Sequence, residues 1–424
     1  AINDNELMAV ERYYWPSKGA LHCTAIVSIS ISRDKIISNL TQPSPFKSAA
    51  AVVWLSMLGA LVVNIQPMFL GAISEVYGFN AAQLGFISGA ELGGGCIASL
   101  IALYWFPRLD LRKLISVALA VAVVGNLVTP MATTYTGLLL VRFCTALFGT
   151  GALYAVILGI IGQMNNPEKL FASAIILQVV SVAVFMLLTP PLISGGSMAG
   201  VTLLMASLMA SGFYAKKYLV IASQKPLEQG ANKNFGLLIW GLPGLALLGL
   251  TVFDIGISSI WAFVERLGSQ AGLSMDESGL ALTVGSAIGV IGAFFAAYLG
   301  LRWGRIKPFV ASILGLLVAC LIFIEASSWL NYMLAVALLN LFWNFALPYL
   351  LGSIALFDKT GRLMVLIPAA QSAGFALGPI ISGLLIVGTD YRVSAVVGAG
   401  AFVCCAAIVV PMLLKIKKNP VGQK

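Results

Sequence analysis

The sequence has few charged residues and only one histidine. Charged residues make up 10% of its 424 residues, whereas a soluble domain carries roughly 25%. The six cysteines lack the spacing of a metal site, and the chain contains no HExxH, GxSxG or phosphate-binding loop. These absences argue against a soluble enzyme, a metalloenzyme and a nucleotide-driven pump. We therefore expect no enzyme activity, no cofactor and no bound metal.

Long apolar runs are abundant instead. Hydrophobic residues make up 59% of the chain, and the mean hydropathy is +0.97. A membrane-spanning helix needs roughly 20 apolar residues, whereas a barrel strand shows roughly 10 residues of alternating polarity. The continuous runs predict an all-α polytopic membrane protein. We expect twelve transmembrane helices, over residues 49–75, 81–105, 112–132, 136–162, 170–191, 197–217, 235–264, 276–300, 307–326, 330–355, 363–387 and 392–415.

One stretch of the chain occurs twice, as GFNAAQLG at residues 78–85 and GLSMDESG at residues 272–279. The same spacing aligns Arg108 with Arg302 and Lys113 with Lys307. Each copy is a turn, a glycine-rich apolar run and a basic loop, which predicts two pseudo-symmetric six-helix halves. We divide the chain into an N-terminal cytoplasmic segment (1–48), a first bundle (49–217), a linker (218–234), a second bundle (235–415) and a tail (416–424).

The repeated turns have the residues of helix ends. Gly78 and Gly272 permit a sharp exit from the preceding helix, while Asn80 and Ser274 are suited to cap the next one. Glu277 completes a capping box with Ser274. The glycines that follow allow close helix packing, which serves either static packing or a rocking motion of the halves.

The positive charges fall on alternate loops. The loops on one side of the membrane carry only Arg266 and Arg392. The loops on the other side and the C-terminal tail carry Arg108, Arg112, Lys113, Lys169, Lys216, Lys217, Lys225, Lys233, Arg302, Arg305, Lys307, Lys359, Arg362, Lys415, Lys417, Lys418 and Lys424. Because cytoplasmic loops are enriched in Lys and Arg, both termini are predicted to be cytoplasmic, in the inner or plasma membrane of the cell. The net charge of +9 thus reflects topology rather than nucleic-acid binding.

Twelve helices, a six-plus-six repeat and basic loops after the second and eighth helices resemble the major facilitator superfamily of secondary transporters, over about residues 49–415. The segment Arg302-Trp303-Gly304-Arg305-Ile306-Lys307 is similar to the family's loop signature G-x-x-x-D-R-x-G-R-R/K, with Leu301 at the Asp position. The first loop keeps Arg108, Arg112 and Lys113, with Pro107 at that position. The resemblance implies that these six cations belong to gating loops; the alternative is that they only anchor the topology.

The fourth predicted helix also resembles this family. Arg142 is followed by Gly149 and Gly151, similar to the pattern R-x-x-x-x-x-G-x-G, in which the resemblance links the arginine to proton coupling. Ionisable groups at membrane depth are costly and are therefore candidates for function. Glu91, Arg142 and Asp254 are the clear ones. Glu91 and Arg142 are expected to pair, either as a structural salt bridge or as a protonatable carboxylate with its partner.

Three further carboxylates, Glu75, Glu265 and Glu325, lie near predicted helix ends and are expected to reach water. Asn64 and Gln66 precede Pro67, which is able to break the helix and free carbonyl groups at a site. Polar residues inside the later helices are further candidates for solute binding, in competition with a role as bridges between helices. They are Asn340, Trp343, Asn344 and Gln371, with Gln178 a weaker candidate.

We therefore expect a monomeric secondary transporter that lies in the lipid bilayer and moves a small organic solute by alternating access. Protons are expected to be coupled through Glu91, Asp254 and Arg142. The solute would contact Asn64, Gln66, Arg142, Asp254, Asn340, Trp343, Asn344 and Gln371. Since Glu91 aligns with Gly285 in the repeat, the proton chemistry is expected mainly in the N-terminal half. The alternatives are an efflux antiporter for amphipathic or toxic compounds, and a membrane sensor derived from a transporter.

Overall fold

The computed structural model describes residues 44–105, 109–164, 167–193, 197–220, 241–356 and 362–418, and within these ranges every regular element is helical. The chain divides into two units at Lys47, and the second unit, Ser48–Lys424, is described here. Its first helices are α2 (Pro45–Tyr77), α3 (Ala81–Trp105), α4 (Leu111–Val128), α5 (Tyr135–Thr145), α6 (Gly151–Ile161), α7 (Pro167–Ile193) and α8 (Ala199–Ala215). The later ones are α10 (Leu242–Trp261), α11 (Val264–Gln270), α12 (Met275–Leu299), α13 (Ile306–Glu325), α14 (Trp329–Ala355), α15 (Arg362–Leu385) and α16 (Arg392–Lys418).

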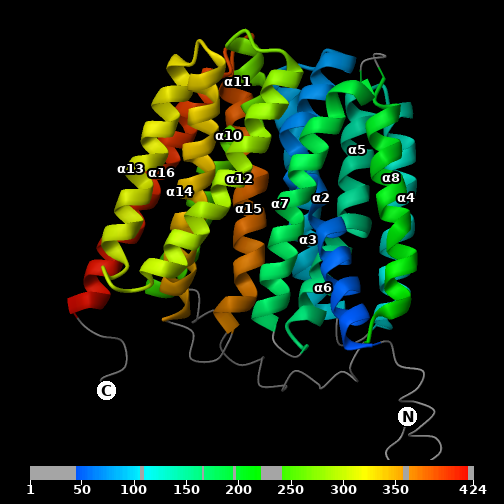
Figure 1. The fold of residues 1–424 in the computed structure, drawn as a ribbon, viewed down its shortest axis with the longest axis horizontal. Coiled ribbons are helices and arrows are strands. Elements are labelled where there is room, and N and C mark those ends of the chain that lie inside the picture. Colours follow the sequence, from blue (N-terminus) through cyan, green and yellow to red (C-terminus); the bar gives the residue numbers. More distant parts are fainter. Residues whose placement is uncertain are drawn as a thin grey trace, which may run out of the picture. The chain divides into compact units, whose positions relative to one another are not determined.

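Each of the twelve predicted helices has a counterpart among these elements, which run side by side in Figure 1. Among the described residues, eleven helical segments are long and apolar enough to cross a membrane. The remaining predicted helix, the sixth, corresponds to α8, which has 17 residues and continues into a 3-10 turn at Lys216–Tyr218. The prediction of an all-helical multi-pass membrane protein is confirmed.

Two predicted helices are interrupted. The fourth consists of α5 and α6, joined by the π-helical turn Ala146–Thr150. The seventh ends at Trp261, because Ala262 and Phe263 form a turn before α11, so its predicted end at residue 264 is wrong. Its predicted residues 235–240 lie outside the described ranges. The expectation that Pro67 breaks the first helix is also wrong, since α2 continues through it.

The two repeated turns form helix caps as predicted. Gly78 and Gly272 have φ angles of 66° and 83°, a region that favours glycine. Ser274 and Glu277 form a capping box at the start of α12. Asn80 and Gln83 do the same before α3, since each side chain accepts a hydrogen bond from the other residue's backbone N–H. The cap chemistry of the repeat is therefore conserved in space as well as in sequence.

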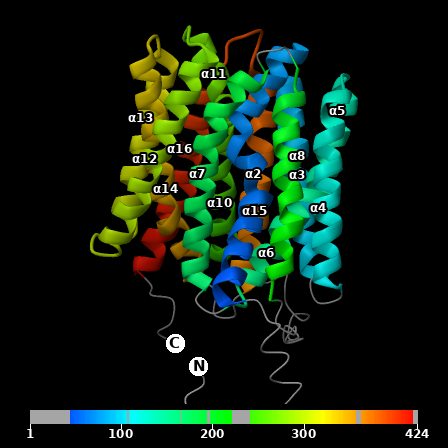
Figure 2. The same cartoon turned by 45° about the vertical axis from the view of Figure 1, so that its right-hand side comes forward.

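The helices pack as two groups (Figures 1 and 2). In the first group α4 contacts α8 and α3 contacts α5 and α6, while in the second α10 contacts α15 and α16, and α12 contacts α14. Two pairs in extensive contact across the groups are α3 with α15 and α7 with α12. In the repeat these are equivalent pairs, because α3 corresponds to α12 and α15 to α7.

Glycine makes the crossing contacts close. A Cβ on Gly85 of α3 would lie 2.3 Å from the carbonyl oxygen of Pro379 on α15. Likewise, a Cβ on Gly279 of α12 would lie 2.7 Å from the carbonyl oxygen of Met186 on α7. Both contacts lie toward the bundle end that carries the turns after α2 and α11. We name this the turn end, and we name the other end, which carries Arg112, Lys113, Lys216, Lys217 and Arg302, the basic end.

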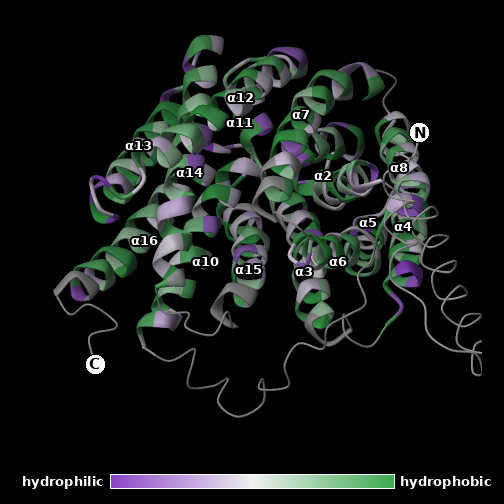
Figure 3. Cartoon of the chain, turned by 60° about the horizontal axis from the view of Figure 1, so that its bottom comes forward, coloured by the Kyte–Doolittle hydropathy of each residue, from purple (hydrophilic) through white to green (hydrophobic). Residues whose placement is uncertain are grey.

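The outward faces of the helices are apolar, as the green colouring in Figure 3 shows. Large side chains such as Val180, Leu203 and Phe294 are more than half exposed, at 52%, 58% and 66%. Such a surface is unfavourable in water and is suited to hydrocarbon.

Replacing Gly85 with Ala is expected to destabilise the protein, by about 1–3 kcal/mol, because its Cβ collides with a backbone carbonyl that has little room to move. Gly93→Ala is the matched control, since its Cβ would meet only the Ala376 Cβ, at 4.0 Å, on the same partner helix. Thermal unfolding in detergent measures both. Equal melting temperatures for the two variants would contradict the close approach of α3 and α15.

Candidate functional site

Glu91 of α3 and Arg142 of α5 form an ion pair inside the first group, as predicted. The side chains are 6% and 0% exposed. Arg142 Nη1 also donates to Asn126 Oδ1 at 3.0 Å and to Thr129 Oγ1 at 3.3 Å, both near the end of α4. The guanidinium lies 4.8 Å from the centre of the Phe69 ring of α2. In this conformation Arg142 therefore has protein partners rather than a surface open to solute.

Two of these partners, Asn126 and Thr129, were missed by the sequence analysis. The signal that could have identified Asn126 is an amide in the middle of an otherwise apolar run. The π-helical turn follows Arg142 by one helical turn and brings Gly149 against the backbone of Ala122 on α4. Such turns are frequent at functional sites, and here the turn places α4 close beside the arginine.

Asp254 of α10 is the second buried ionisable group, and it is fully buried. It interacts with Gln371 of α15, but neither of its carboxylate oxygens has a hydrogen-bond partner of good geometry among the described residues. Its Cβ lies 2.7 Å from where a Cβ on Gly374 would be, so α15 passes directly over it. The predicted residues Asp254 and Gln371 are thus brought together by tertiary packing.

Hydroxyl groups on α10 link it to α15 around Asp254. Thr251 donates to the carbonyl of Ala370, Ser258 to that of Gly374 and Ser259 to that of Gly378, each at 3.2 Å. The three acceptors are four residues apart and therefore lie along one face of α15. This row of three hydrogen bonds fixes the register of α10 and α15, and it holds α15, which carries Gln371, against α10.

The predicted amides of α2 lie near the contact between the groups. Gln66 donates to Ser88 Oγ of α3, and its Oε1 has no partner within the described part of the chain. The Asn64 Nδ2 is buried and also lacks a partner there. The neighbouring carbonyl of Val63 accepts a hydrogen bond from Trp261 Nε1 of α10 at 3.1 Å, which joins the two groups.

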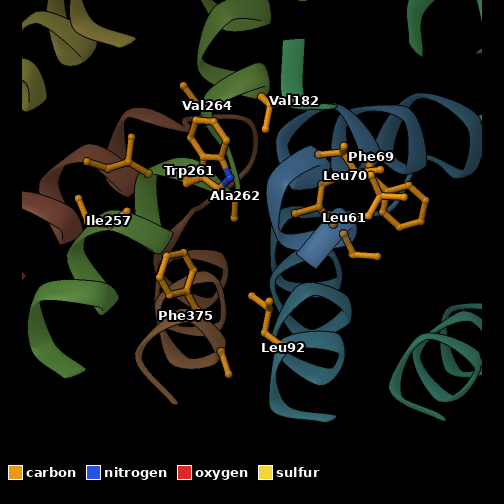
Figure 4. Close-up of a cluster of buried hydrophobic side chains, with 14 of the residues drawn as sticks. Leu61, Phe69, Leu70, Leu92, Val182, Ile257, Trp261, Ala262, Val264 and Phe375 are labelled. Carbon is orange, nitrogen blue, oxygen red and sulfur yellow. The ribbon is translucent and has the colours of Figure 1, made fainter. Parts of the chain in front are cut away.

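Trp343 belongs to an aromatic cluster next to this contact. Its ring centre lies 6.1 Å from that of Trp261 and 5.8 Å from that of Phe375. Figure 4 shows Trp261 and Phe375 facing apolar residues of α2 and α3, with Phe375 across from Leu92. Asn340 and Asn344, in contrast, lie against Gly289 of α12 and donate to carbonyls of their own helix. The structure thus places these two amides between helices α12 and α14.

The predicted gating-loop cations lie at the basic end. Arg108 lies outside the described residues. Arg112 and Lys113 are exposed in the first turn of α4, which Asp110 caps by accepting from their backbone N–H groups. Arg302 lies 5.2 Å from the Tyr298 ring centre, Arg305 lies beside Gly352 of α14, and Lys307 is exposed in the first turn of α13. None of the three ion pairs among the described residues involves these cations.

The expectation that Glu265 reaches water is wrong. Its side chain is 2% exposed and accepts a hydrogen bond from Arg266 Nε at 2.7 Å. Arg266 Nη2 also donates to the carbonyl of Gly71 on α2 at 3.1 Å, across the contact between the groups. The interruption of the predicted helix before α11 turns this pair inward, and the sequence pattern carries no sign of that turn. Glu75 and Glu325 are exposed, as predicted.

Fold and site together define a class. The chain is a multi-pass helical membrane protein with ionisable groups buried in each of two helix groups, and with polar and aromatic side chains where the groups meet. Secondary transporters place their substrate sites near the middle of the membrane at such a contact between two helix groups.

Comparison with known proteins relates the second part of the chain to a family. Residues 246–424 match the family model described as Major Facilitator Superfamily. No curated protein matches the chain in sequence. The nucleoside transporter NupG shares 15% identity, with a TM-score of 0.63 over 86% of this chain and 98% of that one. Over residues 246–424 the chain is therefore similar to the Major Facilitator Superfamily, and the solved structure of this transporter shares the fold of most of the chain.

Two more solved structures have the same fold. An inward-facing, unoccupied bacterial homolog of the human lysosomal transporter Spinster has 13% identity and a TM-score of 0.66, covering 90% of this chain and 100% of that one. A D-xylose–proton symporter has 14% identity and a TM-score of 0.67, covering 85% and 97%. At these identities the likeness establishes the fold alone.

Removing one partner of the buried ion pair is expected to be costly. Arg142→Met leaves Glu91 as an unpaired buried carboxylate, and we expect a loss of about 3–5 kcal/mol in the free energy of unfolding. The double variant Glu91→Leu/Arg142→Met removes both charges and is expected to recover most of that loss. Thermal or denaturant unfolding in detergent measures these changes.

The surface pair of Asp390 and Arg392 is the control for this experiment. Hydrogen bonds from Arg392 and from Gln270 lower the pKa of Asp390 to about 2, so the pair is ionised at neutral pH. Both side chains are about half exposed, so Arg392→Met should cost far less stability than Arg142→Met. A double variant as unstable as Arg142→Met alone would contradict the role assigned to charge pairing.

Proposed function

We propose that the protein couples proton movement to the transport of an uncharged, polar organic solute by alternating access. The observation that carries the proposal is the environment of Asp254. Its carboxylate is fully buried and has no well-formed hydrogen bond within the described ranges. Holding such a group in its charged form is costly, because burial removes it from bulk solvent and no ion pair among the described residues includes it. A change in its surroundings that admits water therefore favours loss of its proton.

Asp254 suits this role better than Glu91. Glu91 is already paired with Arg142, and that pair is held by Asn126 and Thr129. A carboxylate with a permanent cationic partner has less reason to exchange its proton during a cycle. We propose that Asp254 carries the proton and that the Glu91–Arg142 pair keeps the first group rigid. This shifts the expected site of proton chemistry toward the second group.

The position of Asp254 supports coupling to movement. Its interaction partner Gln371 lies on α15, and α15 also packs against α3 of the other group through Pro379 and Gly85. A change in the charge of Asp254 acts on the same helix that closes the turn end. The proton and the conformation of the two groups are therefore able to influence one another through α15.

The polar groups near the contact favour an uncharged solute. Arg142 is fully buried and Arg266 is 16% exposed, and each of these two cations is paired with a carboxylate. Asn64 Nδ2, Gln66 Oε1 and the aromatic faces around Trp343 offer hydrogen bonds and stacking instead. Sugars and nucleosides combine hydroxyl groups with a flat or apolar face. The printed names of the nucleoside transporter and the D-xylose–proton symporter give the same suggestion by analogy.

The remaining expectations complete the proposal. We propose that both termini and the basic end are cytoplasmic, following the distribution of Lys and Arg, and that the protein works as a monomer in the inner or plasma membrane. The basic residues of the loops after α3 and α12 are proposed to act in gating, in line with the family resemblance.

Asp254→Asn is expected to abolish solute accumulation driven by a pH gradient in proteoliposomes, while exchange of labelled for unlabelled solute continues. The variant keeps the side-chain shape but cannot release a proton. Asp254→Glu should restore part of the response. Glu91→Gln is the matched control in the other group and is expected to lower the rate without removing the response to the gradient. Accumulation by Asp254→Asn equal to that of the original protein would refute the proton role.

Trp343→Ala is expected to raise the KM for the transported solute by about tenfold, because aromatic contacts are worth about 0.5–1.5 kcal/mol beyond the apolar area they bury. Asn344→Ala is the control, since Asn344 lies against α12 rather than in the aromatic cluster.

The class of solute is identified first, by measuring uptake of a labelled nucleoside, pentose, dicarboxylate and amphipathic cation. Preferred uptake of the dicarboxylate would contradict the proposal of an uncharged solute.

Efflux of amphipathic compounds is the second candidate function. It is favoured by the apolar aromatic cluster that Trp261, Trp343 and Phe375 form near the contact between the groups. Cells with and without the protein, exposed to a panel of toxic amphipathic compounds, distinguish the two functions. Protection by the protein would support efflux. A sensor derived from a transporter would bind its solute but fail to move it in proteoliposomes.

A further inference from the structure

A basic cavity lies between α4 and α8 at the basic end of the first group. It has a volume of about 250 Å³ and is lined by Arg112, Lys113 and Ser116 of α4 and by Lys216 and Lys217 after α8. Ile115 and Leu219 form its buried floor, at 0% and 1% exposure. Four cationic side chains from two separate segments thus surround one small space.

The part of the chain that the structure describes supplies no ion-pair partner for the charges in this cavity. None of the ion pairs among the described residues includes these four side chains. The nearby carboxylate of Asp110 is engaged by the backbone N–H groups of Arg112 and Lys113. Lys216 donates to Ser116 Oγ, which leaves two of its three N–H donors. A ligand for this space is therefore anionic and accepts several hydrogen bonds.

The side chains are partly held in place before any ligand binds. Ser116 Oγ donates to the carbonyl of Arg112 at 2.6 Å and accepts from Lys216, so α4 and the end of α8 are tied together. Lys216 Nζ lies 5.2 Å from the Phe213 ring centre, and Lys217 Nζ lies 5.6 Å from that of Tyr214. Aromatic rings beside lysines are typical of the zone where lipid headgroups meet the hydrocarbon.

A separate apolar groove lies farther along α4 from the basic end. The groove has a volume of about 370 Å³ and lies between α4 and α5, with Ala120, Val124 and Val128 on one wall and Val141 on the other. Lys113, Val117, Ala120, Val124 and Val128 are spaced four, three, four and four residues apart, so they form one stripe on the helix. Val117 and Val124 are each 57% exposed.

The stripe has the length of a lipid chain. From Lys113 to Val124 it covers roughly 16 Å at a rise of about 1.5 Å per residue. A free phosphate ion would use only the basic cavity, whereas a phospholipid would use both the cavity and the groove. We propose that this surface binds an anionic phospholipid, with its phosphate among Arg112, Lys113, Lys216 and Lys217 and an acyl chain along the groove between α4 and α5.

This assignment is additional to the gating role proposed for Arg112 and Lys113, and it gives a role to Lys216 and Lys217, which had none. It is independent of the proposed solute and of proton coupling. A lipid bound here would bridge α4 and α8 and so stabilise the first group.

The test titrates delipidated protein in detergent with dioleoyl phosphatidylglycerol or dioleoyl phosphatidylcholine and counts bound lipid by native mass spectrometry. We expect the anionic lipid to bind roughly tenfold more tightly or better, because each basic side chain near the headgroup adds attraction. The double variant Lys216→Gln/Lys217→Gln should lose this preference. Lys307→Gln/Lys415→Gln removes the same charge at the basic end of the second group and should keep it.

Two further measurements identify the ligand. Val124→Trp fills the groove and is expected to weaken binding of the long-chain lipid while leaving binding of a short-chain phosphatidylglycerol unchanged. Excess inorganic phosphate is expected not to displace the lipid. Displacement by phosphate would overturn the lipid assignment in favour of a free phosphate site, and equal lipid preference in both double-lysine variants would overturn the site itself.

Discussion

The absence of water inside a bilayer is the constraint on which this structure depends. A polar group in the hydrocarbon region must find its partner within the protein. Arg142 does so with Glu91, Asn126 and Thr129, and the hydroxyls of α10 do so with carbonyls of α15. Asp254 is the buried carboxylate among the described residues without a well-formed hydrogen bond, and this exception is where the proposed chemistry lies.

Close packing around α15 connects that chemistry to the arrangement of the two helix groups. Gly374 and Gly378 let α10 approach on one face, and Gly383 lets α3 approach on another, with its Cβ position 2.5 Å from the carbonyl of Ala81. A helix gripped on two faces cannot move against one neighbour without disturbing the other, because packed interiors shift between discrete arrangements. α15 is therefore the element through which we propose that a proton on Asp254 and the closure of the turn end are linked.

The scaffold is symmetric, but the chemistry is not. The crossing contacts of α3 with α15 and of α12 with α7 are equivalent in the repeat. Glu91, however, corresponds to Gly285, which packs against Val336, and the first group carries a closed ion pair where the second carries an unpaired carboxylate. The roles that we propose for the two groups, rigid support and response to protons, rest on these buried side chains rather than on the shared helix contacts.

The sequence by itself determined the class, the approximate helices, the repeat with its caps, and the pairing of Glu91 with Arg142. These follow from local properties: hydrophobic length, turn residues and the cost of isolated charge. The inward turn of Glu265 and Arg266, the partners Asn126 and Thr129, and the meeting of Asp254 with Gln371 were decided only by tertiary structure. They depend on how each helix is rotated and where it is interrupted, and an almost uniformly apolar helix carries little pattern from which its rotation can be predicted.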